Sequence, residues 1–379
     1  MYSQEDLNSA VAAGAISADA ASALRAHVAA TKDAMPADAE HFRLITGFND
    51  IFVSIAVIIL LVAMAAIGQA IAGAIVPVPA YDPFLTGDAW RETMAQRQFA
   101  EGVAVSLAAV FVAGTAWLLS EFFTRKRRMA LPSILLLLAF VGGVMAAQAG
   151  VLIGWFSAEE GSNQTVGLVL LSIAALVTAG AAWVHWRRFM VPITIAAGTA
   201  AVAGTAILLM VAAIGPEAKN IETVVLSLIF VAGLVVFAFA MRWDMTDPRR
   251  ETRRSDVAFW LHLVAAPMIA HPVFALLGVT DGDNIGALAA IAVVAVYIVF
   301  GLIALAIDRR ALLVSALAYV LIALTFLFRE FGAVELNFAL TALVIGSALL
   351  TLSALWTPIR AGVVKALPGM MQHRLPATA

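Results

Sequence analysis

Residues 253–278, RRSDVAFWLHLVAAPMIAHPVFALLG, have the length and apolar content of one membrane-crossing helix. The stretch begins with an arginine pair, and His262 and His271 lie inside its apolar run. Pro267 and Pro272 each remove one backbone hydrogen bond, so we expect them to kink the helix. Other apolar runs along the chain follow a similar layout, although none of them has both histidines and both prolines.

The composition indicates an integral membrane protein. The chain has 379 residues, of which 63% are hydrophobic and 13% charged. Soluble domains contain about 45–50% apolar and about 25% charged residues, so this chain has too much apolar surface to bury in water. The absence of cysteine excludes disulfides, thiolate metal sites and cysteine nucleophiles.

Ten apolar runs are each close to the length that crosses a bilayer. We therefore predict an all-α fold, a polytopic transmembrane helical bundle occupying residues 47–358, with a tail at 359–379. The segment 76–98 is the one long connection, and its prolines and aromatic residues suit the headgroup region. The predicted spans are residues 50–75, 99–121, 130–155, 166–186, 190–214, 222–241, 256–278, 285–306, 311–328 and 337–356.

The placement of lysine and arginine supports this number of spans. With both termini in the cytoplasm, 19 of the 23 cations fall in inner segments. Acidic residues divide almost evenly, as expected when lysine and arginine alone set the orientation. A missed or extra span would invert every later segment and remove this asymmetry. The sequence thus predicts a multi-pass membrane protein with both termini in the cytoplasm, in contact with membrane lipids.

Residues 1–46 are polar and predict a small cytoplasmic helical hairpin with a linker. The helices are expected at about residues 4–13 and 18–33, with Ser3 and Ser17 as N-terminal caps. The hairpin is too small to hold itself folded, so we expect residues 1–40 to associate with the membrane domain, a second copy or another protein. Its predicted core is Leu7, Val11, Ile16, Leu24 and Val28.

Arginine pairs recur near the start of several outgoing spans, at residues 127, 187, 253 and 309. One explanation is duplication of a helical hairpin, with Pro132 and Pro192 at the same place in the first turn. The other is the preference for cations on the inner side, which places arginines at every second turn of any up-and-down bundle. The sequence leaves both explanations open.

Two histidines in one span are the first candidates for a binding site. His262 and His271 lie on opposite faces of a straight helix, about 13 Å apart along its axis. They therefore cannot share a metal ion unless the helix bends sharply. The functional interpretation is a kinked span lining a cavity, whose histidines bind a headgroup or relay a proton. The structural interpretation is hydrogen bonding to neighbouring helices.

Three other polar residues are candidate ligand contacts. Arg329 and Glu330 follow the ninth apolar run, and the arginine either pairs with Glu330 or Glu335, holds a lipid phosphate, or extends to the interface. Gln148 is a lone amide inside a span, where such residues commonly bond a neighbouring helix. The sequence contains no metal-binding, nucleotide-binding or hydrolase motif, and it indicates no metal, cofactor or nucleic acid.

Four stretches resemble bacterial polytopic inner-membrane proteins of an alphaproteobacterial type that have a short N-terminal helical hairpin. These are AAGAISADAASALRAHV (12–28), FRLITGFNDIFV (42–53), WLHLVAAPMIAHPVF (260–274) and LSALWTPIRAGVVKALP (352–368). The resemblance covers most of the chain. It implies an inner-membrane location and carries no activity with it.

Three classes of function fit the sequence. The first is a transporter or flippase for a lipid or small amphiphile, favoured by ten spans and the proline-containing seventh span. The second is a non-catalytic membrane scaffold or sensor that acts through the N-terminal hairpin. The third is a membrane-embedded enzyme, which requires a polar cluster that the sequence does not show.

Overall fold

A computed structural model describes residues 10–24, 48–80, 82–156, 163–248, 250, 252–279, 286–330, 336–372 and 375. Ten of the helices in these ranges are long and apolar enough to cross a membrane, which confirms the predicted polytopic helical bundle. The helices are α3 (Phe48–Ile75), α4 (Gly87–Ser120), the π-helix η1 (Glu121–Lys126), α5 (Ala130–Phe156), α6 (Gln164–Phe189), α7 (Ile193–Ile214), α8 (Ile221–Met245), α9 (Arg253–Leu276), α10 (Ala287–Ile307), α11 (Ala311–Glu330), α12 (Asn337–Ala354), α13 (Trp356–Ala366) and α14 (Gly369–Gln372).

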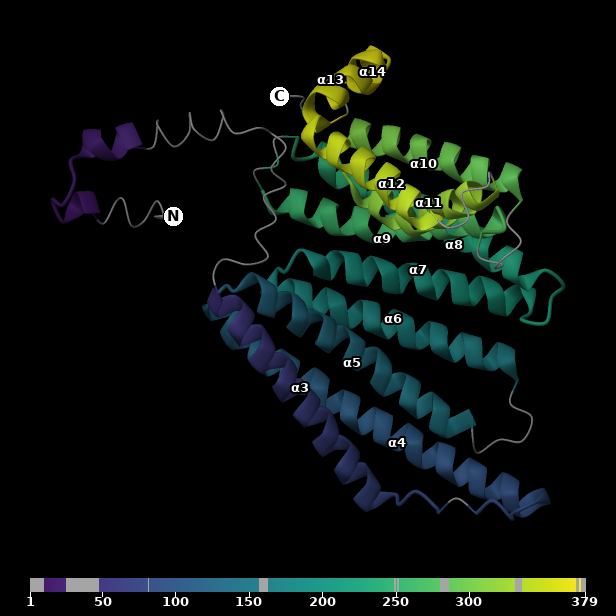
Figure 1. The fold of residues 1–379 in the computed structure, drawn as a ribbon. Coiled ribbons are helices and arrows are strands. Elements are labelled where there is room, and N and C mark those ends of the chain that lie inside the picture. The colour runs from purple at the N-terminus through teal and green to yellow at the C-terminus, as the bar shows by residue number, and fades with distance from the viewer. Residues whose placement is uncertain are drawn as a thin grey trace.

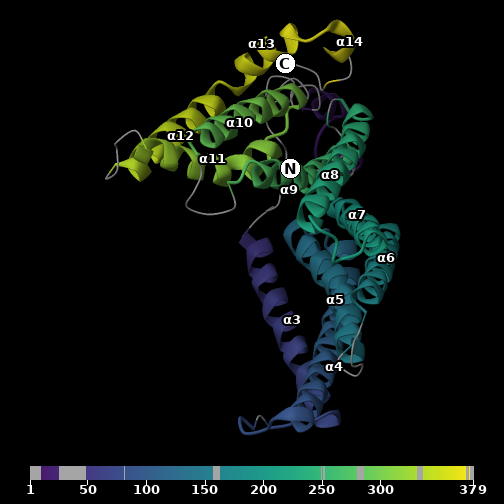
Figure 2. The same cartoon turned by 90° about the vertical axis from the view of Figure 1, so that its right-hand side faces the viewer.

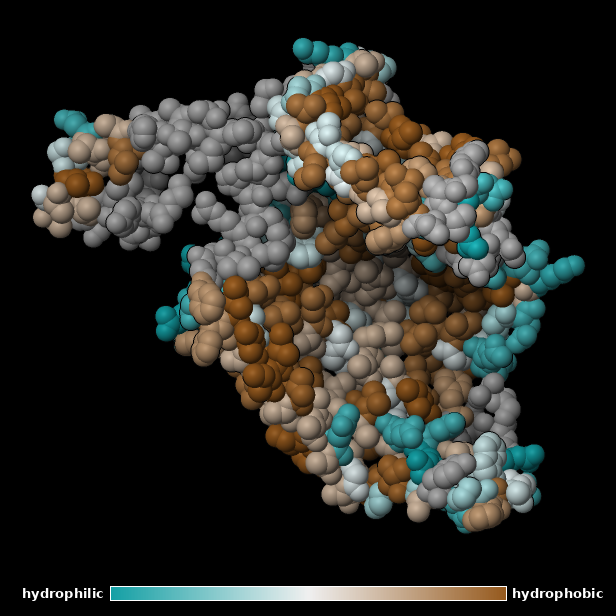
Figure 3. Space-filling model, in the orientation of Figure 1, coloured by the Kyte–Doolittle hydropathy of each residue, from teal (hydrophilic) through white to brown (hydrophobic). Residues whose placement is uncertain are grey.

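Successive spans pack as antiparallel hairpins: α4 with α5, α6 with α7, α8 with α9, and α10 with α11. The hairpins form a row in which α3–α5 lie at one end and α10–α12 at the other (Figures 1 and 2). Apolar side chains cover much of the visible face (Figure 3), as expected for a surface in contact with lipid.

The seventh span, α9, is the most buried crossing. In its apolar window 56% of residues are buried, against at most 33% in any other span of the described chain. It contacts α7, α8 and α11. Small residues make this packing close: a Cβ atom added at Gly233 of α8 would lie 2.9 Å from the backbone of Met268. Residues 253–276 therefore form the most enclosed helix of the bundle.

The helix α9 continues from Arg253 to Leu276 through both prolines. Pro272 is buried, whereas Pro267 is exposed. A proline lacks the N–H that would bond the carbonyl four residues earlier, so the carbonyls of Leu263 and Met268 lose their usual partners. The kink that we predict at these prolines stays a prediction.

The predicted long connection is shorter than expected. Residues 87–98 continue the helix α4, which with η1 extends to Lys126 and exceeds the length needed for one crossing. No proline follows Pro83 in this segment, and Asp88 in the first turn suits the positive end of the helix. The polar first turns of α4, residues 87–98, therefore precede the apolar part that can cross the membrane.

The turns that contain the arginine pairs share one backbone feature. Each has a non-glycine residue with positive φ, and these residues are Arg128, Met190, Arg250 and Asp308. The arginine pairs occupy different places around this residue: Arg187 precedes Met190, whereas Arg309 follows Asp308. Pro132 is inside α5, but Pro192 precedes the first residue of α7. The arginine pairs are thus not structurally equivalent, which favours the charge-placement explanation of their recurrence.

The described part of the N-terminal segment is helical at residues 10–12 and 18–24. The Ser17 hydroxyl accepts a hydrogen bond from the backbone N–H of Ala20 at 3.1 Å, in agreement with its predicted capping role. Ser3, Leu7 and Val28 lie outside the described residues. The helix α13 crosses the predicted boundary between the membrane domain and the tail at residue 359; it packs on α10, and its first residue, Trp356, is buried.

Candidate functional site

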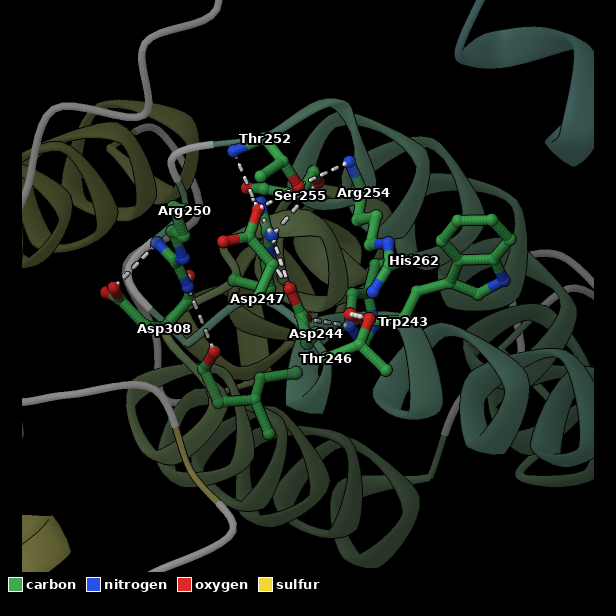
Figure 4. A network of polar contacts seen from close by, with 12 residues as sticks. Trp243, Asp244, Thr246, Asp247, Arg250, Thr252, Arg254, Ser255, His262 and Asp308 are labelled. Atoms are coloured by element: carbon green, nitrogen blue, oxygen red, sulfur yellow. Dashed lines mark hydrogen bonds and ion pairs between the residues drawn. The ribbon is translucent and has the colours of Figure 1, made fainter.

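A buried network of charged side chains lies at the end of α8 and the beginning of α9 (Figure 4). The carboxylate of Asp244 accepts a hydrogen bond from Nε2 of His262 at 2.8 Å and from Nη2 of Arg309 at 2.6 Å. The side chains of Asp244 and His262 are each 2% exposed, and that of Arg309 is 4% exposed. The Arg309 guanidinium also bonds the carbonyl of Ser255 at 3.3 Å. Residues from α8, α9 and the α10–α11 turn therefore meet at the carboxylate of Asp244.

A second carboxylate extends the network to α13. Asp308 accepts hydrogen bonds from Nη1 of Arg250 at 2.8 Å and from the indole Nε1 of Trp356 at 2.7 Å. Nε of Arg360 lies 3.6 Å from the same carboxylate. Asp308 has a positive φ of 57°, which ends α10 and turns the chain into α11. The two carboxylates thus connect the second half of the bundle.

This network is suited to holding helices together. Its charges are paired at short distances, and a charge removed from such a pair would leave its partner buried and uncompensated. In the described residues, no group of three or more histidine, aspartate or glutamate side chains is placed to hold a metal ion. We assign His262 to this network as a hydrogen-bond partner that orients Asp244.

His271 has different surroundings. Its side chain is exposed, and Nδ1 lies 2.7 Å from the hydroxyl of Tyr319 on α11. Tyr319 in turn stacks on Phe274, with ring centroids 4.6 Å apart. At 1.5 Å per residue, His271 is about 27 Å along α9 from Arg253. The two predicted histidines therefore take part in separate arrangements on one helix.

His271 belongs to an exposed stripe on α9. Leu263, Pro267 and His271 recur every four residues, share one face of the helix and are exposed. The other sides of α9 contact α7, α8 and α11. The most buried span thus keeps one face open at membrane depth, and the histidine is the titratable residue on that stripe.

The His271–Tyr319 pair offers one free hydrogen-bond donor in either tautomer. If the phenol donates to Nδ1, the N–H on Nε2 stays free. If Nδ1–H donates to the phenol oxygen, the O–H of Tyr319 stays free. The pair can therefore bind an acceptor oxygen on a molecule that approaches α9 from the bilayer.

No known family, curated protein or solved structure matches this chain. The functional argument consequently depends on the geometry of these residues.

The other predicted contacts are dispersed. Nε2 of Gln148 lies 3.2 Å from Oγ1 of Thr178 and 3.3 Å from the carbonyl of Ala174, so the amide links α5 to α6. Arg329 and Glu330 are exposed at the end of α11. Glu335, a suggested partner of Arg329, lies outside the described residues. The structure therefore does not bring these three candidates together with the histidines.

Sequence reasoning missed the buried charge network, including Asp244, Asp308 and Arg309, and it also missed His185. Asp244 and Arg309 are 65 positions apart and were counted only as inner-segment charges. Their one sequence signal is that each is a charge at the very edge of an apolar run. His185 is fully buried on α6, where its ring lies 4.6 Å from that of Phe189 and its Nε2 has no hydrogen-bond partner in the described structure.

Proposed function

We propose that the protein transports a lipid or small amphiphile, which reaches it from the bilayer along the open stripe of α9. The observation that supports this most is the contact between His271, exposed on the most buried span, and Tyr319 of α11. A polar group facing lipid is costly, and ionisable residues inside a membrane commonly belong to a substrate or ion pathway. A donor that faces the bilayer favours a ligand that is itself dissolved in the membrane.

We further propose that the membrane is the bacterial inner membrane and that both termini face the cytoplasm. The orientation is supported by the sequence asymmetry, in which 19 of 23 cations fall in the same set of turns. The bacterial inner membrane is supported by the resemblance of residues 12–28, 42–53, 260–274 and 352–368 to bacterial inner-membrane proteins. With this orientation, the buried charge network lies near the cytoplasmic side and His271 near the outer leaflet. The open stripe then faces lipid molecules of that leaflet.

The test is lipid translocation in proteoliposomes. Vesicles that contain the purified protein and a headgroup-labelled phospholipid should lose fluorescence to an impermeant quencher faster than protein-free vesicles. His271→Leu and Tyr319→Phe should each slow this loss, because each removes one partner of the polar pair. Ile298→Ala on α10 is the control, since this side chain is 58% exposed and outside the stripe.

Translocation equal to that of protein-free vesicles, or unaffected by both substitutions, would contradict the transporter. The alternative is then a non-catalytic scaffold or sensor that acts through the N-terminal hairpin. The observation favouring it is the tightly paired network around Asp244, which suits a rigid support. If the protein is a scaffold or sensor, deletion of residues 1–40 should abolish its function. If it is a transporter, the shortened protein should still translocate lipid.

A further inference from the structure

A groove of about 340 Å³ opens between α3, α4 and α5, away from the open stripe of α9. This volume is at the lower end of the range for ligand pockets, roughly 300–1,000 Å³. Its lining is apolar except for the side-chain amide of Gln69. The lining includes Gln69 of α3, Ala108 of α4, and Leu138, Gly142 and Ala146 of α5.

The depth of the groove limits what can occupy it. Its α5 residues, from Leu138 to Ala146, lie about 12–24 Å along the helix from Ala130. The hydrocarbon core is about 30 Å thick, so this part of the groove is inside it. Its occupant is therefore apolar.

The amide of Gln69 indicates what lies at one end of the groove. The side chain is exposed, and it makes no hydrogen bond with any other residue of the described chain. Gln69 lies about 9 Å along α3 from Ile75, towards the end of the span. An amide that faces lipid without a partner is costly, because the bilayer core has no water to bond it. A molecule in the groove that has an acceptor oxygen at this depth would remove the cost.

We propose that this groove binds one acyl chain of an ester-linked membrane lipid, and that the Gln69 amide donates a hydrogen bond to the ester carbonyl. Ester carbonyls join the apolar chains to the headgroup and so lie at the edge of the hydrocarbon core. The 28 residues of α3 extend about 42 Å, more than the roughly 30 Å of the core, so its last turns lie beyond this edge and Gln69 lies close to it. The chain then lies against the glycine and alanine residues of α5. This site is separate from the His271–Tyr319 pair and does not depend on transport.

Two glycines make the test selective. A Cβ atom added at Gly142 would meet no other atom within 4 Å, so the side chain of Gly142→Leu starts in open space and should occupy part of the groove. Gly114 on α4 has the same free space but does not line the groove, and Gly114→Leu is the matched control. Both variants should fold, which the thermal unfolding temperature in detergent checks.

The probe is an ester-linked phosphatidylglycerol with a photoactivatable group halfway along one acyl chain. After illumination of proteoliposomes, mass spectrometry should find labelling of residues 138–146 above that of the lipid-exposed helix α12. Gly142→Leu should reduce this labelling to the α12 level, and Gly114→Leu should leave it unchanged. Labelling that is no higher than in α12, or that persists in Gly142→Leu, would overturn the site.

A second comparison tests the amide. Gln69→Leu should lower labelling by the ester-linked probe about fivefold, the loss expected for one hydrogen bond. It should leave labelling by an ether-linked probe unchanged, since that lipid lacks the carbonyl. Equal labelling of wild type and Gln69→Leu by the ester probe would overturn the role of the amide. A change of oligomeric state in Gly142→Leu, measured by light scattering, would assign the groove to a contact between copies and overturn the lipid proposal.

Discussion

Two buried histidines in this protein have opposite roles in its stability. His262 bonds Asp244 in the charge network, whereas Nε2 of His185 has no hydrogen-bond partner among the described residues, and its ring packs among Trp117, Phe140 and Phe189. A buried polar atom without a partner is destabilising, while one that satisfies a buried carboxylate is stabilising. Removal of the polar ring at the two positions should therefore have different effects on stability.

His262→Phe should lower the free energy of unfolding by about 2 kcal/mol, because it leaves one oxygen of Asp244 without its main donor. The double variant His185→Phe, Thr194→Val removes both members of a weak 3.4 Å contact and should be close to neutral. Thermal unfolding in detergent, followed by circular dichroism, measures both. A similar loss in the two variants would contradict the assignment.

The Asp244–Arg309 ion pair should be among the most sensitive positions in the chain. Arg309→Met leaves a buried carboxylate without its cation, so we expect a loss of about 3–5 kcal/mol. The control is Arg91→Met, which breaks an ion pair between side chains that are 65% and 99% exposed and should change little. Denaturant titration of the two variants in the same micelles compares them. An Arg309→Met variant as stable as Arg91→Met would mean that the buried ion pair does not hold the helices together.

At the scale of single helices, the contact between α4 and α5 depends on glycine. A Cβ atom at Gly102 would lie 2.5 Å from the carbonyl oxygen of Gly150, and one at Gly150 would lie 2.4 Å from Oγ of Ser106. The helices can approach this closely because neither residue has a side chain. Replacement must therefore push the backbones apart.

Gly102→Ala should destabilise the protein by about 1–3 kcal/mol, as overpacking does in close-packed interiors. Gly180→Ala on α6 is the control, because its added Cβ atom meets nothing within 4 Å. The measurement is the midpoint of thermal unfolding in detergent. If Gly102→Ala is as stable as Gly180→Ala, then the close approach of α4 and α5 at this point is not needed.

The elements were largely predictable, but the way they pair was not. Hydropathy found every span because a continuous apolar run of sufficient length has few alternatives in a helical membrane protein. The helical start of α4 was missed because residues 87–98 are polar and resemble a connecting segment. The pairing of Asp244 with Arg309 was also missed, since periodicity describes one helix at a time and cannot show which distant charge lies opposite. Tyr319, the partner of His271, gave no signal for the same reason.

For the whole molecule, the orientation in the membrane can be tested with single cysteines, because the chain has none of its own. Cysteines at Asp88 and Glu217 should react with an impermeant maleimide in intact cells, whereas those at Thr246 and Met370 should react only after the cells are opened. All four positions are exposed in the structure, so a lack of reaction at any of them cannot be explained by burial. One position that reacts from the wrong side would contradict the proposed orientation.

The central position of α9 has a consequence for how the protein is made. Its most apolar window has a mean hydropathy of 1.6, the lowest of the ten spans, whereas α8 and α10 both reach 2.9. Charged and polar groups oppose insertion of an isolated helix, and α9 contains Asp256, His262 and His271. During synthesis α9 should therefore leave the translocon only together with the helices that pack against it. A nascent chain that ends before α11 lacks one of the three helices that contact α9, so this segment should enter the lipid less completely than it does in the full chain.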